Sequence, residues 1–165
     1  MMDEKAFMES IERLGESLPR FDDGRIDYSG SSFAPVTSVF IRCGDEFLLL
    51  KRSERVNTYR GKWNTVAGYL DEPRPIREKV AEELSEELGL SVEGASSVRF
   101  GEPYEFMDES LGRTWFIHPV LVEFDEKPEV VLDWEHTEYR WVRFSELGSY
   151  DKFPKFMESL RRVLD

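Results

Sequence analysis

A short stretch of the chain, residues 68–90 (GYLDEPRPIREKVAEELSEELGL), is rich in carboxylates that repel one another. Glu83, Glu86 and Glu87 lie three and four positions apart or adjacent, so a helix would gather them on one side. Like charges at this spacing destabilise a helix by about 0.2–0.5 kcal/mol per pair. A divalent cation would remove the repulsion, since Mg²⁺ prefers oxygen ligands and is commonly shared between carboxylates and substrate phosphates. The cluster is therefore either a solvated helix face or a cation site.

The residues around the cluster predict the helix that would position it. Pro75 suits a first helical position because its fixed φ matches a helix, and Gly89 suits the C-terminal end. One apolar stripe is formed by residues that recur every four positions: Ile76, Val80, Leu84 and Leu88. The three glutamates flank this stripe, so we expect them at the edge of the buried side of the helix.

The same stretch resembles the Nudix box, the signature of the Nudix hydrolase superfamily, whose pattern is G-x5-E-x7-R-E-U-x-E-E-x-G-U, with U a bulky apolar residue. The positions that match are Gly68, Glu83, Leu84, Glu86, Glu87, Gly89 and Leu90. The segments LLLKRS and GKW before the box and EHTEYRWV after it are also similar to the superfamily. The resemblance thus covers about residues 35–147.

Two positions of the box depart from the pattern. Arg74 stands where the family has a glutamate, and Glu82 stands where it has an arginine. In the family these two are thought to pair and to tie the loop to the helix. We predict that Arg74 and Glu82 form the same ion pair with exchanged charges; the alternative is that each points to solvent. The exchange puts in doubt any role of position 74 as a metal ligand or base.

The resemblance implies an α/β fold, a Nudix-type α/β/α sandwich with a mixed β-sheet. Two apolar runs on either side of Gly44-Asp45 agree with it, because they predict a β-hairpin over residues 37–51. Further strands are predicted from apolar runs at residues 98–107, 114–124 and 139–144. Amphipathic spacing predicts a helix over residues 151–164.

The N-terminal region lies outside the resemblance. We assign residues 1–34 to an added helix and arm, with the helix over residues 3–18, and residues 35–165 to the Nudix hydrolase domain. The apolar stripe of this helix, which includes Phe7 and Ile11, packs either on its own domain or on a second subunit. A homodimer is the second possibility.

The resemblance implies a site for Mg²⁺, with Mn²⁺ as the alternative. The metal-binding set would be Glu83, Glu86 and Glu87, together with the backbone carbonyl of Gly68 or of Ala67 just before it. Glu83 and Glu87 would carry catalysis, with Glu83 also a candidate general base.

A further carboxylate often comes from a loop after the box in this family, and Glu135 in DWEHTEYRWV is our catalytic candidate, with Asp133 behind it. The alternative for Glu135 is a surface acid. His136 could assist, although a histidine beside a strand is commonly structural. His118, in the apolar run WFIHPVL, is predicted to be a core or sheet residue.

Phosphate binding requires cations, and a nucleobase requires a stacking surface. Arg52, Arg60 and Lys62 precede the box and are our phosphate-binding candidates, each with plain surface charge as the alternative. The aromatic residues that could stack on a base, or belong to the core, are Trp63, Tyr69, Tyr104, Phe106 and Trp115. We include Tyr69 in the predicted substrate site.

The resemblance implies a metal-dependent hydrolase that cleaves a diphosphate linkage in a nucleoside triphosphate, a dinucleoside polyphosphate or a nucleotide sugar. The segment EHTEYRWV favours the first two over a decapping enzyme. The alternative is a catalytically degenerate Nudix-fold module that binds nucleotides or regulates, which the two departures permit. Isopentenyl diphosphate isomerase shares the fold, but Cys43 lacks the surrounding pattern of that enzyme.

The composition limits the partners. The formal net charge of −12 argues against binding to a nucleic-acid backbone, which requires clustered Lys and Arg. Cys43 is the single cysteine, so no disulfide can form within the chain, as expected in a reducing compartment. The N-terminus lacks a secretory signal pattern, and no apolar run is long enough to span a membrane. These features predict a cytoplasmic protein.

Overall fold

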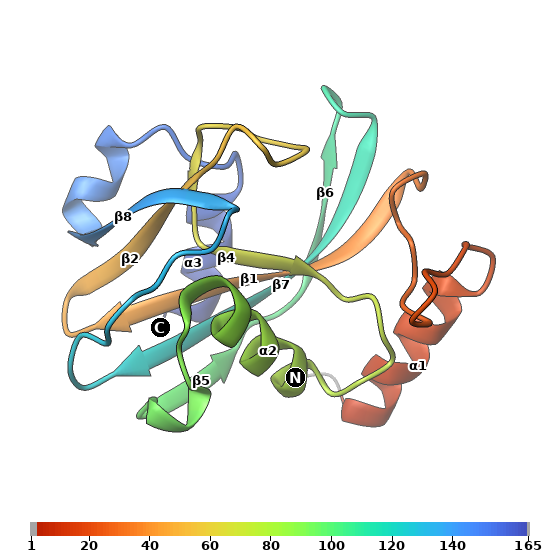
Figure 1. Ribbon diagram of the computed structural model, residues 1–165, viewed down its shortest axis with the longest axis horizontal. Coiled ribbons are helices and arrows are strands. Elements are labelled where there is room, and N and C mark those ends of the chain that lie inside the picture. The colour runs from red at the N-terminus through yellow and green to blue at the C-terminus, as the bar shows by residue number, and fades with distance from the viewer. Residues whose placement is uncertain (1–2, 165) are drawn as a thin grey trace.

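A mixed eight-stranded sheet lies at the centre of the computed structural model, which describes residues 3–164 (Figure 1). The strands are β1 (Phe33–Cys43), β2 (Glu46–Arg52), β3 (Trp63–Asn64), β4 (Val66–Tyr69), β5 (Ser97–Phe100), β6 (Tyr104–Asp108), β7 (Arg113–Phe124) and β8 (His136–Arg143). The helices are α1 (Glu4–Gly15), α2 (Ile76–Leu88) and α3 (Phe156–Val163), with 3-10 turns at Val92–Gly94 and Phe144–Ser149. The predicted mixed sheet with an added N-terminal helix is confirmed.

The two longest strands organise the sheet. β1 and β7 run parallel along their whole length, while the remaining pairings are antiparallel. β1 pairs with β4 along Val36–Val39 but with β2 only at Arg42 and Cys43. β2 therefore diverges from β1 after the predicted turn at Gly44-Asp45, and its other partners are β3 and β8.

Helices cover both faces of this sheet. Figure 1 shows α2 in front of the sheet and α3 behind it. Val80, Leu84 and Leu88 of α2 are fully buried against one face, and Phe156 and Leu160 of α3 are buried against the other. The predicted α/β/α arrangement follows from these two apolar interfaces.

The N-terminal helix packs on its own domain. Phe7 and Ile11 of α1 are buried in a cluster that contains Ile26, Leu70 and Ile117. This contact uses the apolar stripe for which a second subunit was the alternative. Met1, Met2 and Asp165, at the outer ends of the two predicted regions, lie outside the described residues.

Two predicted elements differ most from the observed ones. The strand expected over residues 98–107 is divided into β5 and β6 by residues 101–103, where Pro103 has no N–H to donate to a neighbouring strand. The helix expected from Asp151 begins only at Phe156. Residues 151–153 instead form hydrogen bonds with β3, where Trp63 N–H donates to the Asp151 carbonyl over 2.8 Å. Across residues 3–164, no helix combines the length and the apolar character that crossing a membrane requires.

Candidate active site

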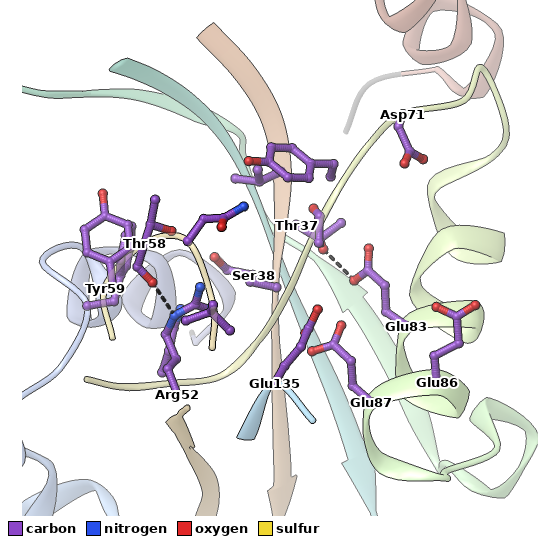
Figure 2. Close-up of a pocket in the computed structure, with 18 of the residues that line it drawn as sticks. Thr37, Ser38, Arg52, Thr58, Tyr59, Asp71, Glu83, Glu86, Glu87 and Glu135 are labelled. Carbon is purple, nitrogen blue, oxygen red and sulfur yellow. Dashed lines mark hydrogen bonds between the residues drawn. The ribbon is translucent and has the colours of Figure 1, made fainter. Parts of the chain in front are cut away.

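A cleft with a volume of about 330 Å³ opens between α2, β1, β4 and the loop after β2 (Figure 2). Thr37 and Ser38 of β1 and Gly68 of β4 lie along its floor. Residues 82–87 of α2 form one wall, and residues 52–59 form another. The divergence of β2 from β1 gives this space its width.

The cleft wall on α2 forms as the sequence predicts, with a shift of one residue at its start. Pro75 is the N-cap rather than the first helical residue, and Gly89 ends the helix in the left-handed conformation with φ of 66°. Because Leu84 and Leu88 face the core, Glu83 and Glu87 are drawn into the buried side, with exposed fractions of 6% and 7%. Glu86 is exposed but still lines the cleft.

One of the two carboxylate oxygens of Glu83 has a hydrogen-bond partner among the described residues, and the other has none. Thr37 Oγ1 donates a 2.6 Å hydrogen bond to Glu83 Oε2, while Glu83 Oε1 is buried without a partner. A Cβ atom at position 68 would lie 2.6 Å from Glu83 Oε1, so only glycine allows this approach of the β4 backbone. Burial raises the pKa of Glu83 to about 8.

Glu87 and Glu135 lie side by side in the cleft, with their carboxylates close together (Figure 2). Glu87 Oε1 is buried and has no hydrogen-bond partner. Burial, followed by the negative charges of Glu135 and Glu83, raises the pKa of Glu87 well above its ordinary value. Burial and Asp133 likewise raise the pKa of Glu135. A cation would relieve this repulsion.

Backbone hydrogen bonds bring the loop that carries Glu135 onto the end of α2. Val131 N–H donates to the Leu88 carbonyl over 2.9 Å, and Asp133 N–H donates to the Glu87 carbonyl over 3.2 Å. The last carbonyls of a helix have no partner inside the helix, so this loop satisfies them. Ser53 N–H in turn donates to the Glu135 carbonyl over 2.7 Å.

His136 follows Glu135 and is 5% exposed at the start of β8. Its Nδ1 atom is buried without a hydrogen-bond partner, 3.5 Å from Asp133 Oδ1. His118 lies elsewhere, in β7, with its ring edge-on to Phe7 of α1 at 5.5 Å between centroids. Its predicted place in the sheet is confirmed, and burial lowers its pKa to about 4.

The residues present fit a divalent cation. Within residues 3–164, five buried side-chain atoms lack a hydrogen-bond partner, and three of them belong to Glu83, Glu87 and His136. Buried polar atoms are usually satisfied, so such a concentration calls for an explanation. Carboxylate oxygens that face one another in a cleft are the donors that Mg²⁺ and Mn²⁺ accept.

Two of the four predicted substrate-binding residues line the cleft. Arg52 lines it beside the acidic group, with Nε donating to the Thr58 carbonyl over 3.0 Å, and Tyr69 lines it with 41% exposure. Arg60 and Lys62 do not line it. Arg60 Nε donates to the Val56 carbonyl, and Lys62 Nζ lies 2.8 Å from Asp151 Oδ1 near the surface.

The aromatic candidates divide in the same way. Tyr69 and Trp115 line the cleft with their ring centroids 6.3 Å apart. Trp63 is buried edge-on to Tyr150. The other two pack away from the cleft: Tyr104 contacts Ser159, and Phe106 contacts Phe153.

The exchanged ion pair is confirmed. Arg74 Nη1 lies 2.8 Å from Glu82 Oε2, so the loop before α2 is tied to the helix. The sequence did not suggest a second tie nearby, in which Lys79 Nζ lies 2.8 Å from Asp71 Oδ1 with both side chains buried. Arg25 of the N-terminal arm also reaches Asp71, over 3.3 Å.

Other cleft residues were also missed. Trp134 is 53% exposed, with the Arg55 guanidinium 5.5 Å from the centre of its ring, and both line the cleft. Asn64 is 5% exposed and lines the cleft. The position of Trp134 between the candidate acids Asp133 and Glu135 was a signal that could have identified it.

Comparison with known proteins supports the resemblance. The sequence matches the profile described as NUDIX domain over residues 32–164. The structure is similar to the MutT protein from Methanosarcina mazei Go1, with 25% identity and a TM-score of 0.64, covering 79% of this chain and 92% of that one. No curated protein matches the chain significantly in sequence.

Two further solved structures are similar at lower identity, and they establish only the fold. An Ap4A hydrolase from C. elegans, in a binary complex, has 18% identity and a TM-score of 0.62 over 78% of this chain and 93% of that one. The Nudix domain of Shewanella oneidensis NrtR, in complex with ADP-ribose, has 11% identity and a TM-score of 0.66 over 80% of this chain and 86% of that one.

Proposed function

The chain belongs to the Nudix family, and on that premise we propose that it is a metal-dependent hydrolase that cleaves a diphosphate linkage in a nucleoside diphosphate derivative. The observation that carries this proposal is the pair of buried oxygens, Glu83 Oε1 and Glu87 Oε1, that lack a partner beside the cleft. A fold that used these residues only for stability would pair them or expose them.

The proposed metal-binding residues are Glu83, Glu86 and Glu87, with the Gly68 carbonyl as a further oxygen. Mg²⁺ is our first candidate and Mn²⁺ the second. When bound, such an ion neutralises phosphate charge and lowers the pKa of water. Glu135, which lies beside Glu87, completes the catalytic group.

Cationic and aromatic side chains that line the cleft would orient the substrate. At the acidic end, Arg52 and Arg55 are available to bind phosphate oxygens, and arginine does so in bidentate fashion. Tyr69 is the aromatic residue available to contact a base because it is 41% exposed, whereas Trp115 is 5% exposed and has the Arg113 guanidinium 4.7 Å from its ring centre. We do not assign Arg60 and Lys62 to the cleft, so their predicted contact with substrate would require a phosphate chain that extends beyond it.

We propose nucleoside triphosphates or dinucleoside polyphosphates as substrates, with nucleotide sugars as the third class. The segment EHTEYRWV and the likeness to a MutT protein and an Ap4A hydrolase support the first two. The likeness to a Nudix domain that binds ADP-ribose favours a second candidate, a binding module without catalysis. The retained unpaired carboxylates argue against that module.

The place and assembly of the protein are also proposals. The cytoplasm is supported by the single cysteine, Cys43. Because α1 uses Phe7 and Ile11 on its own domain, a homodimer would require another surface, and light scattering of the purified protein tests for it. A nucleic-acid partner is not proposed for a chain with a net charge of −12.

The test is product release with Mg²⁺ or Mn²⁺ across nucleoside triphosphates, dinucleoside polyphosphates and nucleotide sugars. Wild-type protein is expected to cleave one class, and Glu87→Gln is expected to be inactive while folded. The matched control is Glu78→Gln, an exposed carboxylate on the same helix that does not line the cleft. If the wild-type protein binds nucleotides but cleaves none of them with either metal ion, the binding module is favoured instead.

A further inference from the structure

The imidazole of His136 lies next to two carboxylates of the cleft, although His136 does not itself line the cleft. Glu87, Glu135 and His136 each present a potential ligand atom, and these three atoms all lie within 4.8 Å of one another. A metal ion bound at about 2.0–2.2 Å holds its ligand atoms no more than about 4.4 Å apart, so only a small side-chain adjustment separates these atoms from a common metal position. The three residues come from different elements, the end of α2, the loop before β8 and β8 itself.

One ring nitrogen of His136 is buried without a hydrogen bond within residues 3–164, and its nearest acidic neighbour is Asp133, with Oδ1 3.5 Å from Nδ1. The residue is 95% buried, and its Nδ1 atom makes no hydrogen bond to the described residues. Leaving a buried polar atom unsatisfied costs about 1–3 kcal/mol. Glu87 Oε1 is in the same condition next to it. Two potential metal-ligand atoms in neighbouring side chains, Glu87 Oε1 and His136 Nδ1, therefore lack hydrogen-bond partners in the described part of the chain.

The backbone directs His136 toward this place. His136 is opposite Arg52 in the β2–β8 pairing, and the register of the two strands shifts between Lys51 and Arg52. Such bulges are common beside active sites, where they re-aim a side chain. Glu135 is fixed just before it by the Ser53 hydrogen bond.

We propose that Glu87, Glu135 and His136 form a mixed oxygen–nitrogen position for a first-row transition-metal ion, of which Mn²⁺ and Co²⁺ are examples. The inference rests on the metal site of the proposed function and adds to it. Glu87 belongs to both sets, whereas Glu83 and Glu86 belong only to the all-oxygen set.

The donor chemistry separates the two positions. Mg²⁺ is a hard ion that takes oxygen ligands, while imidazole suits transition metals. Asp133 Oδ1 lies 3.5 Å from His136 Nδ1 without forming a hydrogen bond to it, so this ring nitrogen remains available to a metal. The protein should therefore retain Mn²⁺ or Co²⁺ when Mg²⁺ is in excess.

The test uses the fact that the chain has only two histidines, His118 and His136. Pulsed electron paramagnetic resonance of the Mn²⁺-loaded full chain detects a coordinated nitrogen, and selective ¹⁵N labelling of histidine assigns it to imidazole. The coupling is expected in wild-type protein and in His118→Asn, and it should be lost in His136→Asn. The His136→Asn variant should also bind Mn²⁺ about 10-fold or more weakly, with Mg²⁺ affinity unchanged.

Each contrary outcome has a distinct meaning. Mn²⁺ bound without histidine coupling in wild-type protein overturns this inference and leaves the all-oxygen site of the proposed function standing. Coupling that survives in His136→Asn also overturns it. Failure of the wild-type chain to bind Mn²⁺ overturns this inference, and failure to bind Mg²⁺ as well overturns the all-oxygen site of the proposed function. If His136→Asn does not fold, the wild-type and His118→Asn spectra decide, because a coupling kept without His118 can arise only from His136.

Discussion

Neighbouring glutamates on α2 differ in how the chain compensates their charge. Glu82 has Arg74 Nη1 at 2.8 Å and Lys79 Nζ at 3.7 Å, and its side chain is one-third exposed. Glu83 and Glu87 are almost fully buried, and each has an oxygen without a partner. Residues 82 and 83 are adjacent, so the difference arises from the face of the helix on which each lies.

The comparison separates a structural carboxylate from a functional one. An exposed ion pair such as Arg74–Glu82 stabilises a protein by about 0–1 kcal/mol and is complete without a ligand. A buried carboxylate without a counter-charge is costly, and its pKa rises in response. Within residues 3–164 no lysine or arginine forms an ion pair with Glu87, and Arg52 interacts with it only at longer range, so we infer that the compensating charge comes with a ligand.

The largest expected effect is on catalysis. Glu83→Gln and Glu87→Gln should each lower kcat about 100-fold or more, because the stabilisation supplied by a bound metal is worth several kcal/mol. Both variants should be at least as stable as wild type without metal, since they remove a carboxyl group whose pKa burial raises and whose ionisation therefore opposes folding. Steady-state kinetics measure the loss of activity, and thermal unfolding in EDTA measures the stability of the metal-free variants. A variant that keeps its activity would place its residue in the same class as Glu82.

The second-largest effect is expected on stability, through the buried ion pair between Lys79 and Asp71. Lys79→Ala should lower the free energy of unfolding by about 3 kcal/mol, because it leaves Asp71 buried with only the partly exposed Arg25 as partner. The control is Lys127→Ala, which breaks the more exposed pair with Glu46 and should cost less than about 1 kcal/mol. Urea unfolding measures both, and equal losses would refute the distinction between buried and exposed pairs.

A smaller effect per pH unit is expected from Glu83. With a folded pKa of about 8 and an ordinary value of 4.5, Glu83 keeps its proton in the metal-free folded state where the unfolded chain has lost it. The unfolded state then binds fewer protons, so the free energy of unfolding should fall as pH rises from about 4.5 to about 8, by up to about 1.4 kcal/mol per unit.

Glu83→Gln isolates this contribution. The difference in unfolding free energy between variant and wild type should grow in favour of the variant across that interval, in EDTA. Parallel pH profiles for the two proteins would show that Glu83 is ionised throughout and that its burial has been compensated in another way.

The smallest effect concerns the exchanged pair. A double-mutant cycle on Arg74 and Glu82 should give a coupling of less than about 1 kcal/mol. Arg74→Glu alone should be the less stable single variant, because it brings a third acid near Glu72 and Glu82. Adding Glu82→Arg should recover most of the loss by restoring the arrangement of the family. Thermal unfolding of the four proteins gives the cycle, and no recovery would mean that the contact adds nothing.

Local patterns predicted the elements that position the site. The four-residue repeat of α2, its end at Gly89 and the hairpin turn at Gly44-Asp45 are all properties of neighbouring residues. The box motif likewise indicated Glu83, Glu86 and Glu87, and the exchange of Arg74 and Glu82 suggested their contact. These predictions needed no knowledge of distant parts of the chain.

The features of the site that local patterns did not predict depend on contacts between residues that are distant in sequence. Lys62 and Asp151 are 89 positions apart, so no local pattern indicates that this lysine is paired. The partners of Lys79 depend on how the loop before α2 turns back. The burial of Asn64 depends on β2 leaving β1 and on residues 151–153 joining β3. Periodicity does not contain such information.

The most direct measurement is calorimetric titration of Mg²⁺ and Mn²⁺ into wild-type protein, Glu87→Gln and Glu82→Gln. We predict that wild type and Glu82→Gln bind the metal ions with similar affinity, because Glu82 is already paired with Arg74. Glu87→Gln should bind them much more weakly, because it loses a carboxylate oxygen that has no other partner. Equal binding by all three proteins, or equal loss in both variants, would contradict the claim that the buried glutamates of α2 form the metal site.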